Sequence, residues 1–249
     1  MKISIITATY NRNKTIKRAI LSVKEQMYKN IELIIVDGGS NDGTVDVIKS
    51  LLDENDTFIS ESDTGIYDAL NKGVTLASGE VIAFLHSDDI YFNNQVLLDV
   101  VEVFANKSVD IVYGDVSFFH FKNTSKIIRK YKSDNLSRIN LAWGKMPAHP
   151  AIFIKRELYN EIGLFNTDYH IAADYEFLCR AINSGPLKTH YLPQVLVKMQ
   201  LGGKSTQGLK NTILLNKEVM KAIKNNGIYT NMFMLLSKYP SKILQFLRK

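Results

Sequence analysis

Residues 3–44 read ISIITATYNRNKTIKRAILSVKEQMYKNIELIIVDGGSNDGT, and two hydrophobic patterns alternate along them. Residues 3–8 and 32–36 are short apolar runs rich in β-branched side chains, which is typical of buried strands. Residues 14–27 between them have the length of a helix, and a glycine-rich turn at 38–43 precedes the next helical stretch. A strand, a helix and a second strand in this order form a βαβ unit. The stretch therefore predicts an α/β fold with a mostly parallel sheet.

The same alternation continues to about residue 113, after which the pattern becomes irregular. Further strands are expected at 57–60 and 81–85, a hairpin at 115–121 and 126–131, and extended segments at 189–192 and 195–200. Further helices are expected at 44–52, 67–77, 94–106, 172–182, 206–225 and 231–248, the last interrupted at Pro240. We predict one doubly wound α/β domain over residues 1–205, with helices on both faces of a Rossmann-like sheet, and a helical C-terminal appendage over residues 206–249.

The charge of the chain favours acidic partners. Its 31 basic and 25 acidic residues give a net charge of +6, which suits nucleic acid, anionic lipid headgroups or phosphorylated substrates. Glu218 is the last acidic residue, and six basic residues follow it. Such a tail suits either a solvated helical surface or a patch that contacts a membrane or a substrate, and the sequence leaves both open.

The cysteine content and the apolar runs indicate where the protein works. Cys179 is the only cysteine, so neither an intrachain disulfide nor a cysteine-based zinc site can form, and a reducing compartment is expected. The longest apolar runs, at 81–85 and 232–236, are too short to span a bilayer. We expect a cytoplasmic protein that is either free or held at the inner face of the cell membrane.

Polar side chains follow each of the four strands predicted in the first half. Ligands of open α/β sheets bind beyond the carboxyl ends of the strands, so these side chains are the candidates for a site. They are Thr9, Tyr10, Asn11 and Arg12 after the first strand, Asp37 after the second, Glu61, Ser62 and Asp63 after the third, and His86, Ser87, Asp88 and Asp89 after the fourth.

Asp88 and Asp89 are the strongest candidates for a functional site among these residues. Two adjacent carboxylates at the end of a buried strand repel each other, and a divalent cation removes that cost. Such a metal could bridge both phosphates of a nucleoside diphosphate and stabilise it as a leaving group. The alternative is that one of the two carboxylates is the N-cap of the helix at 94–106.

The remaining candidates also have two interpretations each. There is no G-x-G-x-x-G or G-x-x-x-x-G-K-[ST] motif, so a glycine-rich phosphate cradle is not expected. Asp37 could accept a hydrogen bond from a base N–H with Tyr10 nearby, or it could form an Asx-turn before Gly38. Asp174 at a helix start could complement the helix dipole, or it could be a general base, which typically contributes about 10²–10⁴-fold to a rate.

Taken in order, these motifs resemble family 2 glycosyltransferases of the GT-A fold, in particular bacterial enzymes that build O-antigen and other surface polysaccharides. The resemblance covers roughly residues 1–205, and several ordered motifs are more specific than any one alone. The matching segments are ISIITATYNR at 3–12, VDGGSNDGT at 36–44, ESDTGIYDALNKG at 61–73, SGE at 78–80, LHSDD at 85–89 and ADYE at 173–176.

The resemblance implies a role for each candidate. Asp174 is the expected base of an inverting transfer, and Asp88, with Asp89 nearby, is expected to hold Mn²⁺ or Mg²⁺. His149 is expected either to face the acceptor or to be a satisfied structural histidine. The residues expected to bind the donor nucleotide are Thr7, Thr9, Tyr10, Arg12, Asp37, Asp63 and Lys204, the last in a loop that closes over the diphosphate.

The sequence departs from the family pattern at two positions. His86 stands where the metal motif often begins with an acidic residue, and Ala173 stands where the residue before the base is often Glu. We expect metal use to survive because Asp88 is present. A second carboxylate beside the base is not expected.

The leading hypothesis is metal-dependent transfer of a hexose from a UDP-sugar to a polyprenyl-diphosphate-linked or oligosaccharide acceptor. The apolar segments 232–236 and 243–247 could then lie in a membrane interface, pack on the core, or pair two subunits. Two alternatives are a sugar nucleotidyltransferase, which lacks support because no glycine-rich basic loop follows the first strand, and a non-catalytic module that binds carbohydrate or nucleic acid. No nucleic-acid recognition motif is present, so nucleic acid is not an expected partner.

Overall fold

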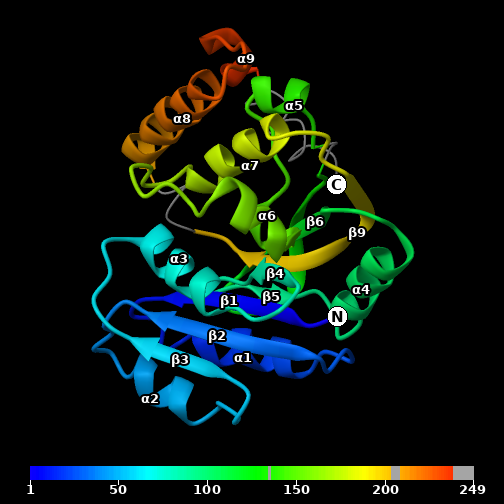
Figure 1. Ribbon diagram of the computed structural model, residues 1–249. Coiled ribbons are helices and arrows are strands. Elements are labelled where there is room, and N and C mark those ends of the chain that lie inside the picture. Colours follow the sequence, from blue (N-terminus) through cyan, green and yellow to red (C-terminus); the bar gives the residue numbers. More distant parts are fainter. Residues whose placement is uncertain (134–135, 203–207, 238–249) are drawn as a thin grey trace.

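One mixed β-sheet with helices on both faces organises the protein (Figure 1). The computed structural model describes residues 1–133, 136–202 and 208–237. The strands are β1 (Ile3–Thr9), β2 (Ile31–Asp37), β3 (Thr57–Ser60), β4 (Val81–Phe84), β5 (Ile90–Tyr91), β6 (Ile111–His120), β7 (Asn123–Tyr131), β8 (Ile152–Lys155) and β9 (Thr189–Gln200). The helices are α1 (Ile16–Lys24), α2 (Thr44–Lys49), α3 (Ile66–Leu76), α4 (Val96–Asn106), α5 (Arg138–Ala142), the 3₁₀ turn η1 (His149–Ala151), α6 (Arg156–Ile162), α7 (Ala173–Asn183), α8 (Gly208–Asn225) and α9 (Met232–Leu236).

The strand order places the ends of the first four strands at one edge of the sheet. The order is β3-β2-β1-β4-β8-β6-β9-β5, and β7 pairs with β6 outside this path. Strands β3, β2, β1 and β4 are parallel, whereas β8 pairs antiparallel with both β4 and β6. The register sets Thr9 beside Asp37 and Asp37 beside Ser60, so three strands end side by side. This edge is where a ligand is expected in an open α/β sheet.

The alternation of side chains along the central strands builds a core on each face of the sheet. Ile3 and Ile5 of β1 pack in the cluster that contains α1 and α4, while Ile6 packs in the cluster that contains α3 and α7. Helix α3 lies very close to β1, because a Cβ atom at Gly73 would stand only 2.3 Å from Cγ2 of Ile6. Glycine at this position therefore allows the helix to approach the strand.

Most of the helices and strands expected from the sequence are present. Their bounds differ where pairing between distant strands determines them. The two extended segments at 189–192 and 195–200 form one strand, β9, because both pair with β6 across an irregularity near Asp115. The predicted hairpin is longer than expected, since β6 begins at Ile111. Pattern reasoning missed the short elements β5, α5 and α6, which have too few residues for a clear periodicity.

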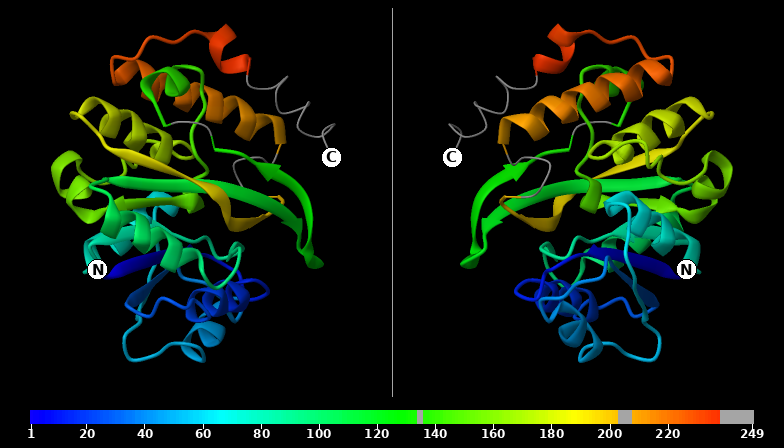
Figure 2. Two further views of the ribbon diagram at one scale, coloured as in Figure 1. Left: turned by 90° about the vertical axis from the view of Figure 1, so that its right-hand side faces the viewer. Right: turned by 90° about the vertical axis from the view of Figure 1, so that its left-hand side faces the viewer.

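The C-terminal helices pack on the domain in the part of the chain that the structure describes. Helix α8 crosses over α7 (Figure 2), and Val219, Ala222 and Ile223 belong to the same apolar cluster as Phe177 of α7. The predicted domain boundary at residue 205 and the helix beyond Ser237 lie outside the described residues, so that division stays a prediction. Among the described helices, none combines the length and apolarity needed to cross a bilayer.

A buried carboxylate ties the amino ends of the strands together at the opposite edge of the sheet. Glu32 accepts hydrogen bonds from the Ser78 backbone N–H at 2.6 Å and hydroxyl at 2.7 Å, and its Oε2 lies 2.5 Å from Nζ of Lys2. Burial raises the pKa of Glu32, but the bonds from Lys2, Ser4 and Ser78 outweigh burial and lower it to about 2.

We expect Glu32→Gln to destabilise the protein at pH 7 by roughly 1–3 kcal/mol, because one pKa unit corresponds to about 1.4 kcal/mol and Gln retains some of the bonds. A carboxyl whose pKa is lowered on folding contributes stability above its unfolded value, and that contribution is lost as the pH falls through its folded value. The difference in free energy of unfolding between wild type and variant should therefore shrink from pH 5 toward pH 2. Urea unfolding at several pH values measures it, and a constant difference would contradict the assignment.

Candidate active site

The turn after β2 is built around the carboxylate of Asp37, which has no exposed surface. Its Oδ2 accepts hydrogen bonds from the backbone N–H of Ser40 at 2.9 Å and from the hydroxyl of Ser60 at 2.7 Å. It also accepts from the N–H of Gly39 at 3.1 Å. The Asx-turn interpretation of Asp37 is thus confirmed, and the side chain shapes the floor of this edge.

Asp63 is the half-buried carboxylate that lies over this turn. A Cβ atom built on Gly38 would stand 2.3 Å from Oδ2 of Asp63, so Gly38 leaves the space that the carboxylate occupies. Oδ1 of Asp63 accepts a hydrogen bond from the backbone N–H of Gly65 at 3.0 Å. The carboxylate is therefore held at the carboxyl ends of β2 and β3 while part of it faces solvent.

The other donor-side candidates divide into buried and accessible groups. Thr7 is buried and donates its hydroxyl hydrogen bond to the carbonyl oxygen of Leu85 at 2.8 Å, which ties β1 to the segment after β4. The buried Oγ1 of Thr9 has no hydrogen-bond partner among the described residues. Tyr10 is 52% exposed and Arg12 is half-buried. Lys204 lies outside the described residues.

Asp88 and Asp89 lie in the turn between β4 and β5. The N-cap of α4 is Gln95, so the alternative that one of the two carboxylates caps this helix is wrong. Asp89 is buried, and its Oδ1 accepts a hydrogen bond from the backbone N–H of Gln200 at 3.0 Å. Burial, and next the charge of Asp88, raise the pKa of Asp89 well above its ordinary value.

Arg18 of α1 lies beside the turn that carries Asp88 and Asp89, but its hydrogen bonds do not go to either carboxylate group. Its Nη2 donates to the main-chain oxygen of Asp88 at 3.0 Å and to the side chain of Gln200. The guanidinium also lies 5.1 Å from the ring centroid of Phe119. Arg18 therefore fastens the Asp88 turn to β6 and β9. The two carboxylates, one half-buried and one buried, feel the charge of Arg18 but keep side-chain oxygens that suit a divalent cation.

Asp174 lies in the first turn of α7. Its Oδ1 is 3.0 Å from the hydroxyl of Tyr67 on α3 and accepts from the N–H of Tyr175 at 2.9 Å. Burial raises the pKa of Asp174 to about 6, although the bonds from Tyr175 and Tyr67 lower it. A carboxylate with a pKa in this range is ionised at pH 7 and still basic enough to accept a proton.

A chain of rings connects the Asp174 side of the site to the Asp88 side. The ring centroids of Tyr67 and Phe165 are 5.7 Å apart, those of Phe165 and His149 are 5.7 Å apart, and those of His149 and His86 are 5.6 Å apart. Because His86 is two residues before Asp88, these ring contacts link the side chain that contacts the predicted base to the turn that carries the predicted metal ligands. This cluster was not foreseen, since its members come from four separate segments.

His149 is neutral in this cluster and is not saturated with hydrogen bonds. Its ring stacks on Phe84 at 4.7 Å, and burial, with a contribution from His86, lowers its pKa to about 3. Its Nε2 is buried without a hydrogen-bond partner among the described residues. This geometry favours a functional group over a satisfied structural histidine.

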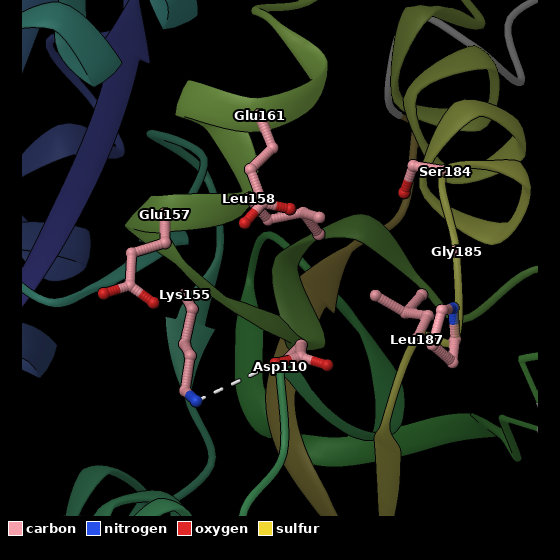
Figure 3. Close-up of a pocket in the computed structure, with 9 residues that line it drawn as sticks. Asp110, Lys155, Glu157, Leu158, Glu161, Ser184, Gly185 and Leu187 are labelled. Atoms are coloured by element: carbon pink, nitrogen blue, oxygen red, sulfur yellow. Dashed lines mark ion pairs between the residues drawn. The ribbon is translucent and has the colours of Figure 1, made fainter.

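A cavity of about 250 Å³ lies at the other edge of the sheet and does not belong to this site (Figure 3). It is lined by Asp110, Glu157 and Glu161, and Nζ of Lys155 is 3.8 Å from Oδ1 of Asp110. Lys155 pairs with Val81 at the amino end of β4, far from the carboxyl ends where Asp37 and Asp88 lie. Three carboxylates against one lysine would also repel a diphosphate.

The sequence matches a known family over most of its length. Residues 4–180 match the family described as Glycosyl transferase family 2. A PGL/p-HBAD biosynthesis glycosyltransferase of Mycobacterium bovis is 33% identical over 224 residues, covering 88% of this chain and 83% of the relative. An uncharacterized glycosyltransferase of Mycobacterium tuberculosis is 32% identical over 195 residues, covering 72% of this chain and 68% of the relative.

Solved structures with low sequence identity share the fold. Residues 1–349 of S. aureus TarS in complex with UDP-GlcNAc have a TM-score of 0.70 at 19% identity, covering 90% of this chain and 67% of that one. Glucosyl-3-phosphoglycerate synthase of Mycobacterium tuberculosis, in complex with Mn²⁺, UDP and glucosyl-3-phosphoglycerate, has a TM-score of 0.64 at 16% identity, covering 92% and 81%. The chain spans only 40% of the longer TarS structure. The likeness confirms the predicted GT-A fold.

Proposed function

The chain belongs to glycosyl transferase family 2 and is a glycosyltransferase, and from this premise we propose that it transfers a hexose from a UDP-sugar with inversion, assisted by a divalent metal. The observation that carries the proposal is a cluster of rings that links the turn of Asp88 and Asp89 at one end to Tyr67, the partner of Asp174, at the other. Family membership rules out the two alternative functions, a nucleotidyltransferase and a non-catalytic module.

The proposed donor site is the edge formed by β1, β2 and β3. TarS and glucosyl-3-phosphoglycerate synthase are solved with UDP-GlcNAc and with UDP, which supports a uridine nucleotide here. Asp63 is the proposed acceptor for the base N–H, because Asp37 is already occupied by the turn and contributes to the shape of the pocket. The orphaned hydroxyl of Thr9 and the exposed ring of Tyr10 are proposed to complete the pocket. Arg12, Thr7 and Lys204 remain proposed donor-site residues.

Asp88, with Asp89 behind it, is the proposed holder of Mn²⁺ or Mg²⁺. The donor set fits a hard cation, because both side chains supply oxygen and burial together with the charge of Asp88 makes Asp89 costly to ionise without one, although Arg18 offsets part of that cost. When bound, the ion would neutralise charge on the departing diphosphate. Glucosyl-3-phosphoglycerate synthase is solved with Mn²⁺, which supports this choice of ion.

Asp174 is the proposed general base. It accepts the proton of an acceptor hydroxyl as that oxygen forms a bond to C1 of the sugar, and the bond from C1 to the diphosphate oxygen breaks on the opposite side. UDP leaves with the electron pair of that bond, so the configuration at C1 is inverted. The shared hydroxyl of Tyr67 holds the carboxylate in place during this step.

The proposed acceptor is a hydroxyl of a sugar linked to polyprenyl diphosphate, as in surface polysaccharide or O-antigen synthesis. His149 is the proposed acceptor-side residue, because its ring contacts His86 and its buried Nε2 has no hydrogen-bond partner among the described residues. The experiment that tests the function is UDP release from a panel of UDP-sugars, with Mn²⁺ or EDTA and a synthetic lipid-diphosphate acceptor. Metal-dependent turnover of one donor supports the proposal, and turnover of none of them would refute it.

The exposed face of α8 and α9 is the proposed contact with an anionic bilayer at the inner face of the cell membrane. Phe233 is 87% exposed and Tyr229 is 77% exposed, although neighbouring Leu235 is buried in the core. The exposed stripe of α8 carries lysines without a carboxylate among them, which complements anionic headgroups. These exposed residues are Lys210, Ile213, Lys217, Lys221 and Lys224.

We expect Lys217→Glu with Lys221→Glu to weaken binding to vesicles that contain phosphatidylglycerol by at least about tenfold, since each lysine near such a surface contributes about 1 kcal/mol. Vesicle sedimentation measures the loss, and Lys14→Glu with Lys49→Glu is the matched control on exposed lysines near α1 and α2. Equal binding to purely zwitterionic vesicles, or an equal loss in the control, would contradict the assignment. Self-association without vesicle binding would point instead to a subunit contact.

A further inference from the structure

The loop that leads into the proposed base helix is held by a carboxylate from a distant helix. Glu218 of α8 accepts hydrogen bonds from three consecutive backbone N–H groups: His170 at 2.9 Å, Ile171 at 2.9 Å and Ala172 at 3.0 Å. Ala172 is the N-cap of α7 and has no side chain that could cap the helix. Glu218 therefore performs from outside the helix the function that a capping side chain would have.

The position of Glu218 is firmly defined by packing. The residue is 7% exposed, and its neighbours on α8, Val219 and Ala222, belong to the core cluster that includes Tyr175 and Phe177 of α7. A buried carboxylate is costly unless hydrogen bonds satisfy it, and the three N–H groups do so. The arrangement thus ties the loop at 170–172 to α8 rather than to its own helix.

The same loop also holds the side chain that contacts the proposed base. The hydroxyl of Tyr67 lies 2.7 Å from the carbonyl oxygen of Ile171 and 3.0 Å from Oδ1 of Asp174. A hydroxyl has one proton, so the carbonyl and the carboxylate share a single donor. A shift of Ile171 would move Tyr67 and change how that proton is divided, which in turn changes the position and basicity of Asp174.

We propose that Glu218 is a positioning residue for the transfer reaction: by binding the N–H groups of 170–172 it sets the place of Asp174 and of the Tyr67 hydroxyl. This proposal rests on the role of Asp174 as the base. Helix α8 then supports the position of the proposed base, although it lies outside the domain predicted over residues 1–205.

Several charged and titratable groups surround Asp174, and together they determine how the charge of Glu218 affects the pKa of Asp174. Tyr67 faces Asp174 from α3 and Glu218 approaches from α8, while Glu176 lies on the same helix and is paired with Arg180 at 2.8 Å. Lys221 lies 4.8 Å from the ring centroid of Tyr169, just before the loop. Burial is the largest cause of the raised pKa of Asp174, and the negative charge of Glu218 adds a smaller contribution, so removing that charge should lower this pKa.

The test compares Glu218→Gln with Glu32→Gln. Glu32 is an equally buried carboxylate, 7% exposed, that accepts several hydrogen bonds at the opposite edge of the sheet. Gln keeps the size of Glu but has one acceptor oxygen, so at least one of the three N–H groups loses its partner. We expect Glu218→Gln to lower kcat about ten- to hundredfold with the donor KM within about twofold, because small misplacements of a reacting group have effects of this size.

Two further readouts separate positioning from general destabilisation. The acid limb of the pH profile of kcat should move to lower pH in Glu218→Gln and stay in place in Glu32→Gln. Hydrogen exchange of the amides at 170–172 should accelerate in Glu218→Gln, while amides in β1 and β2 stay protected. An equal loss of kcat in both variants, or unchanged exchange at 170–172 in Glu218→Gln, would overturn the proposal.

Hydrogen exchange also keeps this proposal distinct from the proposed function. If wild type turned over no donor, the function would fail, but exchange at 170–172 would still report on the contact. Unchanged exchange in Glu218→Gln would refute the role of Glu218 even in a fully active enzyme.

Discussion

Asp174→Asn is expected to lower kcat about 10²–10⁴-fold, the usual contribution of a general base, while UDP binding changes less than about twofold. Asn keeps the size of Asp and can still accept from Tyr67 and from the N–H of Tyr175. It cannot take a proton from an acceptor hydroxyl. Steady-state kinetics measures kcat, and calorimetry with UDP measures binding.

The pH profile gives a second check on Asp174. Burial raises the pKa of this carboxyl to about 6, and only the ionised form acts as a base. The kcat of wild type should therefore rise between about pH 5 and pH 7, and the residual kcat of Asp174→Asn should lack this limb. Activity of Asp174→Asn within threefold of wild type would remove Asp174 as the base.

The sequence predicted well which residues meet at the carboxyl ends of β1, β2 and β3, because local signals specify these strands. The buried strands β1 and β2 have β-branched runs, and the polar residues that follow them must meet once the strands are parallel. Thr9 and Asp37 are adjacent in the register for this reason. Whether Asp37 forms a turn and whether Asp88 caps a helix depended on contacts between segments that are distant in the sequence, which local sequence patterns do not reveal. The hydroxyl of Ser60 comes from a neighbouring strand to complete the turn at Asp37, and α4 begins too late for Asp88 to cap it.

The base side of the site could be predicted only in part, because its contacts join segments far apart in the chain. Tyr67 lies within a quoted motif, yet nothing local indicates that it meets Asp174 more than a hundred positions later. Glu218 looked like the last acidic residue before a basic tail, and its burial against 170–172 depends on how α8 packs on α7. Arg18 likewise reads as a surface residue of an amphipathic helix, although it binds the Asp88 turn.

Asp88→Asn is expected to lower metal-dependent kcat about 10²–10⁴-fold, because charge stabilisation by a bound metal typically amounts to several kcal/mol. The substitution leaves the turn intact, since Arg18 binds the main-chain oxygen of Asp88 and Gln200 binds the side chain of Asp89. It removes one of the two charges that make the site suitable for a cation. Asp46→Asn, at an exposed carboxylate on α2, is the matched control and should retain full activity.

A binding measurement makes the metal assignment independent of the acceptor. If Asp88 holds the ion that contacts the diphosphate, Mn²⁺ must tighten UDP binding in wild type and UDP must tighten Mn²⁺ binding by the same factor. This coupling should vanish in Asp88→Asn and persist in Asp174→Asn, because Asp88 is proposed to act on the departing diphosphate and Asp174 on the attacking hydroxyl. Full turnover of wild type in EDTA would refute a metal role for Asp88. Coupling that survives in Asp88→Asn would mean that the metal is held elsewhere.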